Sequence, residues 1–181
     1  MTLIKGTAKG DNLSFLTIKT GLNDAFVVNR ATRDAIVEAG RNSEELLKPF
    51  LRGENIKRWR LEAEDLFLIN TPRSKVDIEA YPAVKSWLLP FKERLEHRAT
   101  QQQWWELQQA QLAYQGQFLN GGIAFPDLSQ GPKFSRVKAG YLPDCTAFYW
   151  PNIDSWGLSY LNSRLVWFVL YGSSNPMRGG R

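Results

Sequence analysis

The strongest limit on the fold comes from an amphipathic pattern over residues 83–98 of this 181-residue chain. Apolar side chains recur there at three- and four-residue steps and form one stripe, which predicts a helix packed on a core. They are Val84, Trp87, Leu88, Phe91 and Leu95. Pro90 lies inside the pattern. Because a proline within a helix removes a hydrogen bond and clashes with the preceding turn, we expect a kink, or two helices that meet near Leu89.

Short apolar runs on both sides of this helix predict strands and further helices. Strands are expected at residues 13–18, 25–28, 66–69, 122–126 and 147–150, with Gly21, Leu22 and Asn23 joining the first two. Helices are expected at residues 31–39, just after Ser43, and over residues 154–170. The core candidates in the last of these are Leu158, Leu161, Leu165, Phe168 and Val169. The mixture predicts one α+β domain with a small mixed or antiparallel sheet and packed helices.

Two segments have unusual composition. Residues 100–117 are rich in glutamine and contain Trp104 and Trp105, which is compatible with a polar helix face or a low-complexity connector; we expect an irregular helix. Residues 172–181 are polar and rich in glycine, which is typical of a flexible or truncated C-terminal tail.

A basic segment over residues 48–60 is the clearest functional signal. It carries Lys48, Arg52, Lys57, Arg58 and Arg60 against one acid, and a proline and a glycine set the path of its backbone. This composition suits a rigid loop that faces a polyanion, although a solvated surface face would look the same. A second polar, basic loop over residues 129–140 contains Lys133, Arg136 and Lys138. The formal charge of +5 and the pI near 9.4 are compatible with binding to nucleic acid.

Composition also bears on the compartment. Cys145 is alone, so the chain has no intramolecular disulfide and no sign of an oxidising compartment. No apolar run approaches the roughly 18 to 20 residues of a membrane helix, and the first residues lack the apolar stretch of a signal peptide. We expect a cytoplasmic protein without a membrane partner.

Four elements occur in an order that resembles a known family. They are residues 21–26, residues 48–59, residues 81–92 with their Tyr-Pro, Trp-Leu and Phe-Lys pairs, and residues 160–166. This order is similar to the C-terminal specificity domain of TaqI-like restriction–modification enzymes. The resemblance implies that residues 1–171 form a DNA target recognition domain for an adenine methyltransferase, which is often fused to a nuclease. It further implies a fragment of a larger protein, in which S-adenosylmethionine binds the methyltransferase domain.

The residues give little support for catalysis within this chain. No glutamate follows Glu106 and no histidine follows His97, so few groups remain for acid–base chemistry. One histidine and one cysteine cannot form a closed zinc site, and the acids at residues 62–65 fit a solvated turn better than a Mg²⁺ site. Pro126-Asp127 and Pro143-Asp144 lack the downstream acid-X-Lys triplet of many restriction nucleases. No Asn/Asp-Pro-Pro-aromatic motif for amino-methyl transfer occurs. We therefore expect no catalytic, cofactor or metal residues here.

Double-stranded DNA is the partner that we expect, and phosphate and base contacts require different side chains. Lys48, Lys57, Lys133 and Lys138 are candidates for phosphates, because an ammonium suits a diffuse charge. Arg52, Arg58 and Arg136 are candidates for guanine, and Asn55 for adenine. Trp59 would either contact a sugar or plug the loop into the core. The hypothesis requires both basic loops to meet on one face.

Two other classes of function remain open. Exposed tryptophans, with Trp104 and Trp105 as the best candidates, would indicate a protein–protein docking domain. Stacking of tryptophan on bases would also be compatible with RNA binding.

Overall fold

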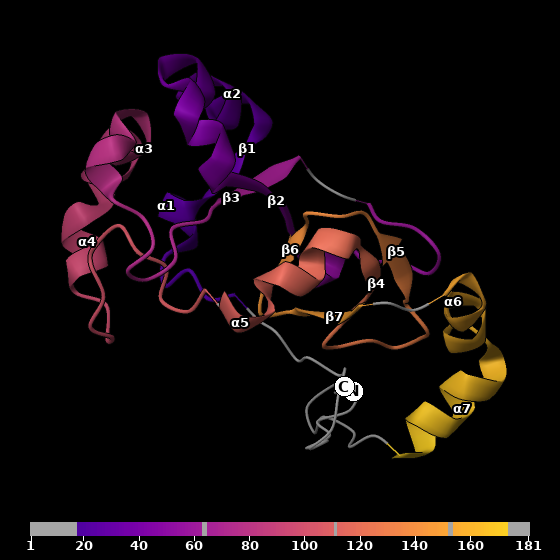
Figure 1. Cartoon of the computed structure of the whole chain (residues 1–181). Helices are drawn as coiled ribbons and strands as arrows, with labels where there is room; N and C mark the ends of the chain where they lie inside the picture. Colours follow the sequence, from indigo (N-terminus) through magenta and orange to yellow (C-terminus); the bar gives the residue numbers. More distant parts are fainter. Residues whose placement is uncertain (1–17, 63–64, 111, 152–153, 174–181) are drawn as a thin grey trace.

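The computed structural model describes residues 18–62, 65–110, 112–151 and 154–173. Their strands form two small sheets, with short helices around them. In Figure 1 the first sheet lies near α2, α3 and α4, and the second lies on the side of α6 and α7. The bounds of these helices are Arg30–Ala39, Pro82–Leu88, Lys92–Glu96, Ser155–Leu161 and Arg164–Ser173. The predicted α+β class is confirmed, with two sheets in place of one. Residues 13–17 of the first predicted strand, and residues 174–181 of the predicted tail, lie outside the described residues.

The first sheet has the strand order β1-β3-β2-β6. Its strands are β1 (Val27–Asn29), β3 (Leu66–Ile69), β2 (Leu47–Leu51) and β6 (Leu142–Pro143). The first three are antiparallel, whereas β6 runs parallel to the end of β2, with Phe50 opposite Leu142. This pairing places the segment after β2 beside the segment after β6. The strand at residues 66–69 has the predicted bounds, but residues 25–28 are divided between α1 (Asn23–Phe26) and β1.

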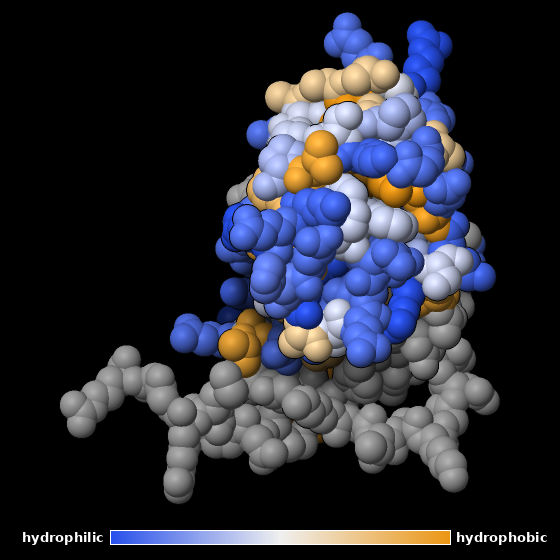
Figure 2. Space-filling view, turned by 90° about the vertical axis from the view of Figure 1, so that its left-hand side faces the viewer, coloured by the Kyte–Doolittle hydropathy of each residue, from blue (hydrophilic) through white to orange (hydrophobic). Residues whose placement is uncertain are grey.

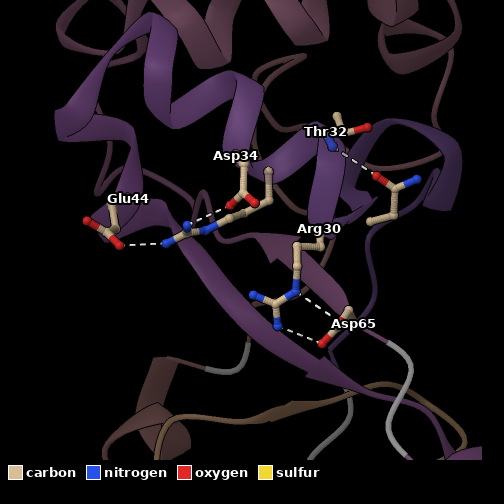
Figure 3. Close-up of polar contacts among 7 residues, drawn as sticks. Arg30, Thr32, Asp34, Glu44 and Asp65 are labelled. Carbon is tan, nitrogen blue, oxygen red and sulfur yellow. Dashed lines mark hydrogen bonds and ion pairs between the residues drawn. The ribbon is translucent and has the colours of Figure 1, made fainter.

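Charged side chains on α2 attach this helix to the first sheet (Figure 3). Arg30 donates two hydrogen bonds to Asp65, at 2.9 Å and 2.7 Å. The hydrogen bonds, with the attraction of the charges, raise the pKa of Arg30 and lower the pKa of Asp65. Arg33 reaches both Asp34 and Glu44, the latter in η1 (Arg41–Leu46). The helix predicted at residues 31–39 is confirmed; it ends at Ala39, and Gly40 is its C-cap.

Pro90 divides the long amphipathic segment in the way that its sequence predicts. α3 is followed by one turn of 3-10 helix, η4 (Leu89–Phe91), and then by α4. Val84 and Leu88 are fully buried, and Leu95 is 2% exposed. The Trp87 indole donates a hydrogen bond to the Ala25 carbonyl at 2.9 Å, which anchors α3 to α1. Figure 2 views the molecule from the side on which α3 and α4 lie in Figure 1; hydrophilic residues cover most of this face, with scattered hydrophobic ones.

The second sheet is antiparallel and has the order β5-β4-β7. β4 (Gly122–Pro126) has the predicted bounds, and β7 (Ala147–Pro151) extends the prediction by one residue. β5 (Ser135–Val137) lies inside the segment that was expected to be a loop. Helices α6 and α7 cover a separate apolar cluster on this sheet. Its buried members are Ile123, Phe125, Phe134 and Phe148, and the residues packed on it are Trp150, Leu158, Leu161, Trp167 and Leu170.

The face that α7 buries differs from the prediction. Leu165, Phe168 and Val169 are 69%, 77% and 59% exposed, so they are not core residues. Among residues 164–172 of this helix, whose burial the structure describes, Val166 is the buried one. Residues 165–171 are all apolar, so helical periodicity cannot indicate which face is buried. Gly172 and Ser173 belong to α7, which therefore runs two residues into the predicted tail.

Residues 100–110 are not helical, so the prediction of an irregular helix is wrong there. Only α5 (Leu112–Gln115) and η5 (Gly116–Asn120) follow. The backbone of the glutamine-rich segment instead forms hydrogen bonds with residues that are distant in the sequence. Lys19 and Gln109 exchange two hydrogen bonds of 2.9 Å, and the Leu107 N–H donates to the Thr71 carbonyl. Arg98 donates to the carbonyls of five residues, at 2.8–3.2 Å, and these are Thr20, Leu95, Gln103, Trp104 and Glu106. Long-range contacts therefore determine this path.

Tyr149 on β7 makes the stability of the protein fall as the pH rises in the alkaline range. Its side chain is 3% exposed, and burial raises its pKa to about 12. An unfolded chain releases this proton near pH 10. Between pH 10 and about 12 the unfolded state therefore binds fewer protons, and the free energy of unfolding falls by about 1.4 kcal/mol per pH unit. We expect Tyr149→Phe to remove this contribution, as urea unfolding between pH 8 and 11 can measure.

The same variant has an expected effect at neutral pH. The Tyr149 hydroxyl is buried and has no hydrogen-bond partner among the described residues. Because an unpartnered buried hydroxyl costs about 1 to 3 kcal/mol, Tyr149→Phe should be at least as stable as the parent at pH 7. Tyr160→Phe, at a tyrosine that is 57% exposed, is the matched control. An alkaline slope that Tyr149→Phe leaves unchanged would contradict the assignment.

Candidate nucleic-acid interface

The first basic loop begins in the sheet and ends in a strained turn. Lys48 lies within β2, opposite Leu68, and is therefore a strand residue and not a loop residue. After Leu51 the chain forms one turn of 3-10 helix, η2 (Gly53–Asn55), and a bridge then joins Ile56 to Leu61. Residues 57–60 form the tip between the two bridge residues. The basic segment is thus held at both ends by hydrogen-bonded backbone.

The two basic loops meet. The Trp59 backbone N–H donates to the carbonyl of Phe134 at 3.1 Å. The Arg58 guanidinium donates to the carbonyl of Asn162 at 2.9 Å. Asn162 is fully buried, and its side chain accepts from the Phe134 N–H and donates to the Phe134 carbonyl. Residues 58–59, the segment around Phe134 and the end of α6 therefore form one hydrogen-bonded junction.

A pocket of about 480 Å³ is lined by residues of both basic loops. Arg52 from the first basic loop and Lys133 from the second both line it. The remaining lining residues are Asn23, Gly53, Glu54, Pro126, Asp127, Leu128, Asp144 and Thr146. The Gly53 N–H donates to the Thr146 hydroxyl at 2.9 Å, so the floor of the pocket joins η2 to the segment between β6 and β7. The structure thus brings Arg52 and Lys133 to one opening.

Most of the predicted cations have a partner within the chain. Arg52 lies 3.5 Å from Glu54, and Lys57 lies 3.5 Å from Glu62, which also pairs with Arg60. The acids of these pairs are exposed, and exposed pairs contribute little to stability, so DNA phosphates can replace them at low cost. Arg136 donates to the Ser155 hydroxyl at 2.9 Å and is exposed.

Lys138 lies farther along the second loop. It is exposed and follows β5, where its backbone approaches Gly121, the residue before β4. The structure therefore places Arg58 and Trp59 at the junction and Arg52 and Lys133 at the pocket. Neither Lys48 nor Lys138 lines the pocket.

Asn55 does not fit its expected role as a reader of adenine. Its side chain is 5% exposed, and its amide oxygen accepts a hydrogen bond from the Arg52 N–H at 3.2 Å. This oxygen already has a donor within the turn, so a base edge could use the amide only by breaking the hydrogen bond that shapes η2. Asn55 therefore shapes η2 and positions the backbone of Arg52.

Trp59 lies at the surface, so of its two expected roles the plug of the loop into the core is wrong. The side chain is 48% exposed, and the Arg58 guanidinium lies 5.6 Å from the centroid of its ring. Its φ angle of 75° is in the left-handed region, which is rare for a bulky residue and costs energy. The backbone hydrogen bond to Phe134 holds this conformation, and an aromatic side chain is presented to solvent between cations.

Acidic side chains of the pocket were missed as binding residues. Asp144 accepts hydrogen bonds from the Thr146 N–H at 2.8 Å and from its hydroxyl at 2.6 Å, while burial raises the pKa of this carboxyl. Asp127 follows β4 directly, and its N–H donates to the Thr146 carbonyl at 2.8 Å. Both residues follow a proline, and these two Pro-Asp pairs are visible in the sequence. The pairs do not indicate that the two aspartates line the same pocket.

The described residues contain neither a metal-binding cluster nor a membrane-spanning helix. Within them, no group of three or more His, Cys, Asp or Glu side chains is arranged to hold a metal ion. No helix that the structure describes has the length and apolar character needed to cross a membrane.

Comparison with known proteins identifies a shared fold but no sequence family. No family model matches the sequence, and no curated protein matches it either. A solved structure of the Type IIL restriction–modification enzyme MmeI, in complex with DNA, superimposes with a TM-score of 0.60 over 90% of this chain, at 13% sequence identity. The chain corresponds to 22% of the length of MmeI. At this identity the similarity establishes the fold, which the chain shares with one part of that enzyme.

Proposed function

We propose that this chain is a sequence-specific recognition domain for double-stranded DNA, belonging to a restriction–modification or phage-defence system. The observation that carries the proposal is the meeting of the two basic loops, which are distant in the sequence. Arg58 and Trp59 bond to the junction, and Arg52 and Lys133 line one pocket. Cations at such a surface can contact phosphates, and a guanidinium can bond a guanine edge. Similarity of fold to part of MmeI, a restriction–modification enzyme solved with DNA, supports this class.

The remaining roles belong to a larger assembly in this proposal. The resemblance to TaqI-like specificity domains suggests that an adenine methyltransferase domain of the same parent chain performs the reaction and binds S-adenosylmethionine. The present domain would select the site and contribute no catalytic group. The methyltransferase would extrude the adenine from the duplex, since chemistry on a base requires its removal from the stack.

Salt dependence and charge removal test the proposal together. We expect the 181-residue chain to bind a duplex with an affinity that falls steeply as salt rises, because phosphate contacts release counterions. Arg52→Ala combined with Arg58→Ala should weaken binding to a cognate duplex by about 1 to 3 kcal/mol for each base that the variant no longer binds. Fluorescence anisotropy with cognate and scrambled duplexes at several salt concentrations measures both effects.

Lys85→Ala combined with Lys92→Ala is the matched control. It removes the same charge from α3 and α4, on the other side of Figure 1 from the second sheet, where both lysines form exposed ion pairs. The control should retain the discrimination between cognate and scrambled duplexes. Equal losses in the two double variants would show that net charge, and not the junction, determines binding.

Protein–protein docking is a second candidate, but the exposed apolar residues that support it are not the predicted tryptophans. Trp104 and Trp105 are half-buried beside the core and pack edge to face, with 5.6 Å between their ring centroids. The exposed apolar side chains lie instead on α6 and α7: Trp156 is 71% exposed and Phe168 is 77% exposed. A surface of this kind is typical of interfaces. It is compatible with DNA binding elsewhere on the domain.

A further inference from the structure

The pocket between the basic loops contains both signs of charge. Arg52 and Lys133 line it together with Glu54, Asp127 and Asp144. A phosphate would be repelled by the carboxylates, so the pocket is poorly suited to the DNA backbone. The edge of a base pair differs from a phosphate, because it presents hydrogen-bond donors and acceptors side by side. The mixed lining therefore favours a base edge over a phosphate.

Two of the three acids already have partners. Glu54 lies 3.5 Å from Arg52, and Asp144 accepts two hydrogen bonds from Thr146. Asp127 differs from both. Its Oδ1 atom is buried and has no hydrogen-bond donor among the residues that the structure describes. A buried acceptor without a donor is unfavourable. The Asp127 side chain as a whole is only half-buried and lines the pocket, so a rotation of the carboxylate would bring an unpaired oxygen to a donor that a ligand supplies.

The position of Asp127 is fixed by its neighbours. It follows β4, and its own N–H is bonded to the Thr146 carbonyl at 2.8 Å. Thr146 in turn bonds Gly53 in η2, and Lys133 lies across the same pocket. The backbone of Asp127 is therefore held at the end of the sheet, a more rigid support than the tip of a loop, and a contact to a base would be correspondingly selective.

The major groove of DNA offers a carboxylate few donors. Among the base edges exposed there, only the exocyclic amino groups of cytosine (N4) and adenine (N6) donate hydrogen bonds. The guanine that pairs with cytosine presents two acceptors, O6 and N7, beside that donor. Donors on Arg52 or Lys133 and an acceptor on Asp127 match this pattern of a G·C pair.

On the basis of the proposed function, we propose that Asp127 determines specificity by accepting a hydrogen bond from the N4 amino group of a cytosine in the target, while Arg52 or Lys133 donates to its guanine partner. The contact selects against thymine, which presents a carbonyl oxygen at the equivalent position and would face the carboxylate with a second acceptor.

Selection from a random duplex library tests this inference on the 181-residue chain. Asp127→Asn keeps the shape of the side chain but adds a donor, so one cytosine position in the selected motif should lose its preference by about fivefold or more, with the other positions unchanged. Asp77→Asn is the control: Asp77 caps η3 (Ile78–Ala80), Asn is an equally good cap, and the parent motif should be retained.

A change in the DNA tests the same hydrogen bond with the parent chain, so the result does not depend on whether the variant folds. The selected cytosine is replaced by a pyrimidinone base that lacks the 4-amino group, and the affinity of the parent chain should fall by about the same factor as Asp127→Asn causes. The variant should be indifferent to that replacement, because both changes remove the same hydrogen bond. Additive losses would overturn the assignment.

The other possible results of the selection also distinguish the inference from the proposed function. A motif that Asp127→Asn leaves unchanged overturns the inference and leaves the proposed function standing. A preference that disappears at an adenine position overturns the assignment to cytosine and gives Asp127 the N6 amino group instead. A parent chain that binds duplexes without selecting any motif contradicts sequence-specific recognition itself, and the inference falls with it.

Discussion

Gly53→Ala is expected to destabilise the protein by at least about 3 kcal/mol, at the upper end of the range for overpacking. A Cβ atom at this position would lie 2.1 Å from the carbonyl oxygen of Thr146. The obstacle is backbone, so no change of side-chain rotamer can relieve the clash. The two segments would have to separate, which would also break the hydrogen bond from the Gly53 N–H to the Thr146 hydroxyl. Urea unfolding at neutral pH measures the loss.

The variant should also lose specific binding, because the pocket is built across this contact. Gly131→Ala is the matched control, since a Cβ there meets no atom within 4 Å and the exchange restricts only the unfolded chain. We expect Gly131→Ala to be as stable as the parent or slightly more stable. Similar unfolding curves for the two variants would mean that η2 and Thr146 do not pack as closely as described.

Leu88→Ala should cost about 2 to 5 kcal/mol of the free energy of unfolding, because it leaves a cavity in the core. Leu88 is fully buried at the end of α3, in the same core cluster as Ala25 and Phe26 of α1. The neighbouring Leu89 is 53% exposed and gives a control of identical chemistry. Leu89→Ala should change stability by less than about 0.5 kcal/mol, as is usual for surface positions.

Thermal and urea unfolding of the Leu88 and Leu89 variants would locate the buried stripe without reference to function. A larger loss in Leu89→Ala than in Leu88→Ala would mean that the helix is rotated about its axis. Both variants should retain the pocket between the basic loops, so any loss of DNA binding in Leu88→Ala should follow its loss of folded protein.

Elements that depend on local patterns were predictable from the sequence. The strand at residues 66–69, the strand at residues 122–126 and the break near Pro90 have the expected positions. In each case a short apolar run or a proline specifies the structure, and the neighbouring turn residues end it. Elements that depend on partners were not predictable in this way. β5 has one buried apolar residue, and its strand conformation follows from pairing with β4.

The candidate site shows the same division. The basic composition of residues 48–60 indicated the first loop, and the structure places its tip against Phe134 in the second. The pocket, in contrast, depends on the parallel pairing of β2 with β6, whose strands lie about 90 residues apart in the sequence. No periodicity encodes such a pairing, so neither Asp127 nor the role of Gly53 could be inferred beforehand. Burial of Asn55 likewise depends on the shape of one turn.

Arg98 has a consequence for how this domain can vary. Its guanidinium contacts main-chain carbonyls of the glutamine-rich segment, and burial lowers its pKa. A carbonyl is present whatever residue carries it, so the route of that segment is largely independent of its side chains. Exposed glutamines there can be exchanged freely, whereas lysine in place of Arg98 would supply too few donors for five acceptors. One side chain thus permits diversity in a whole stretch of its neighbours.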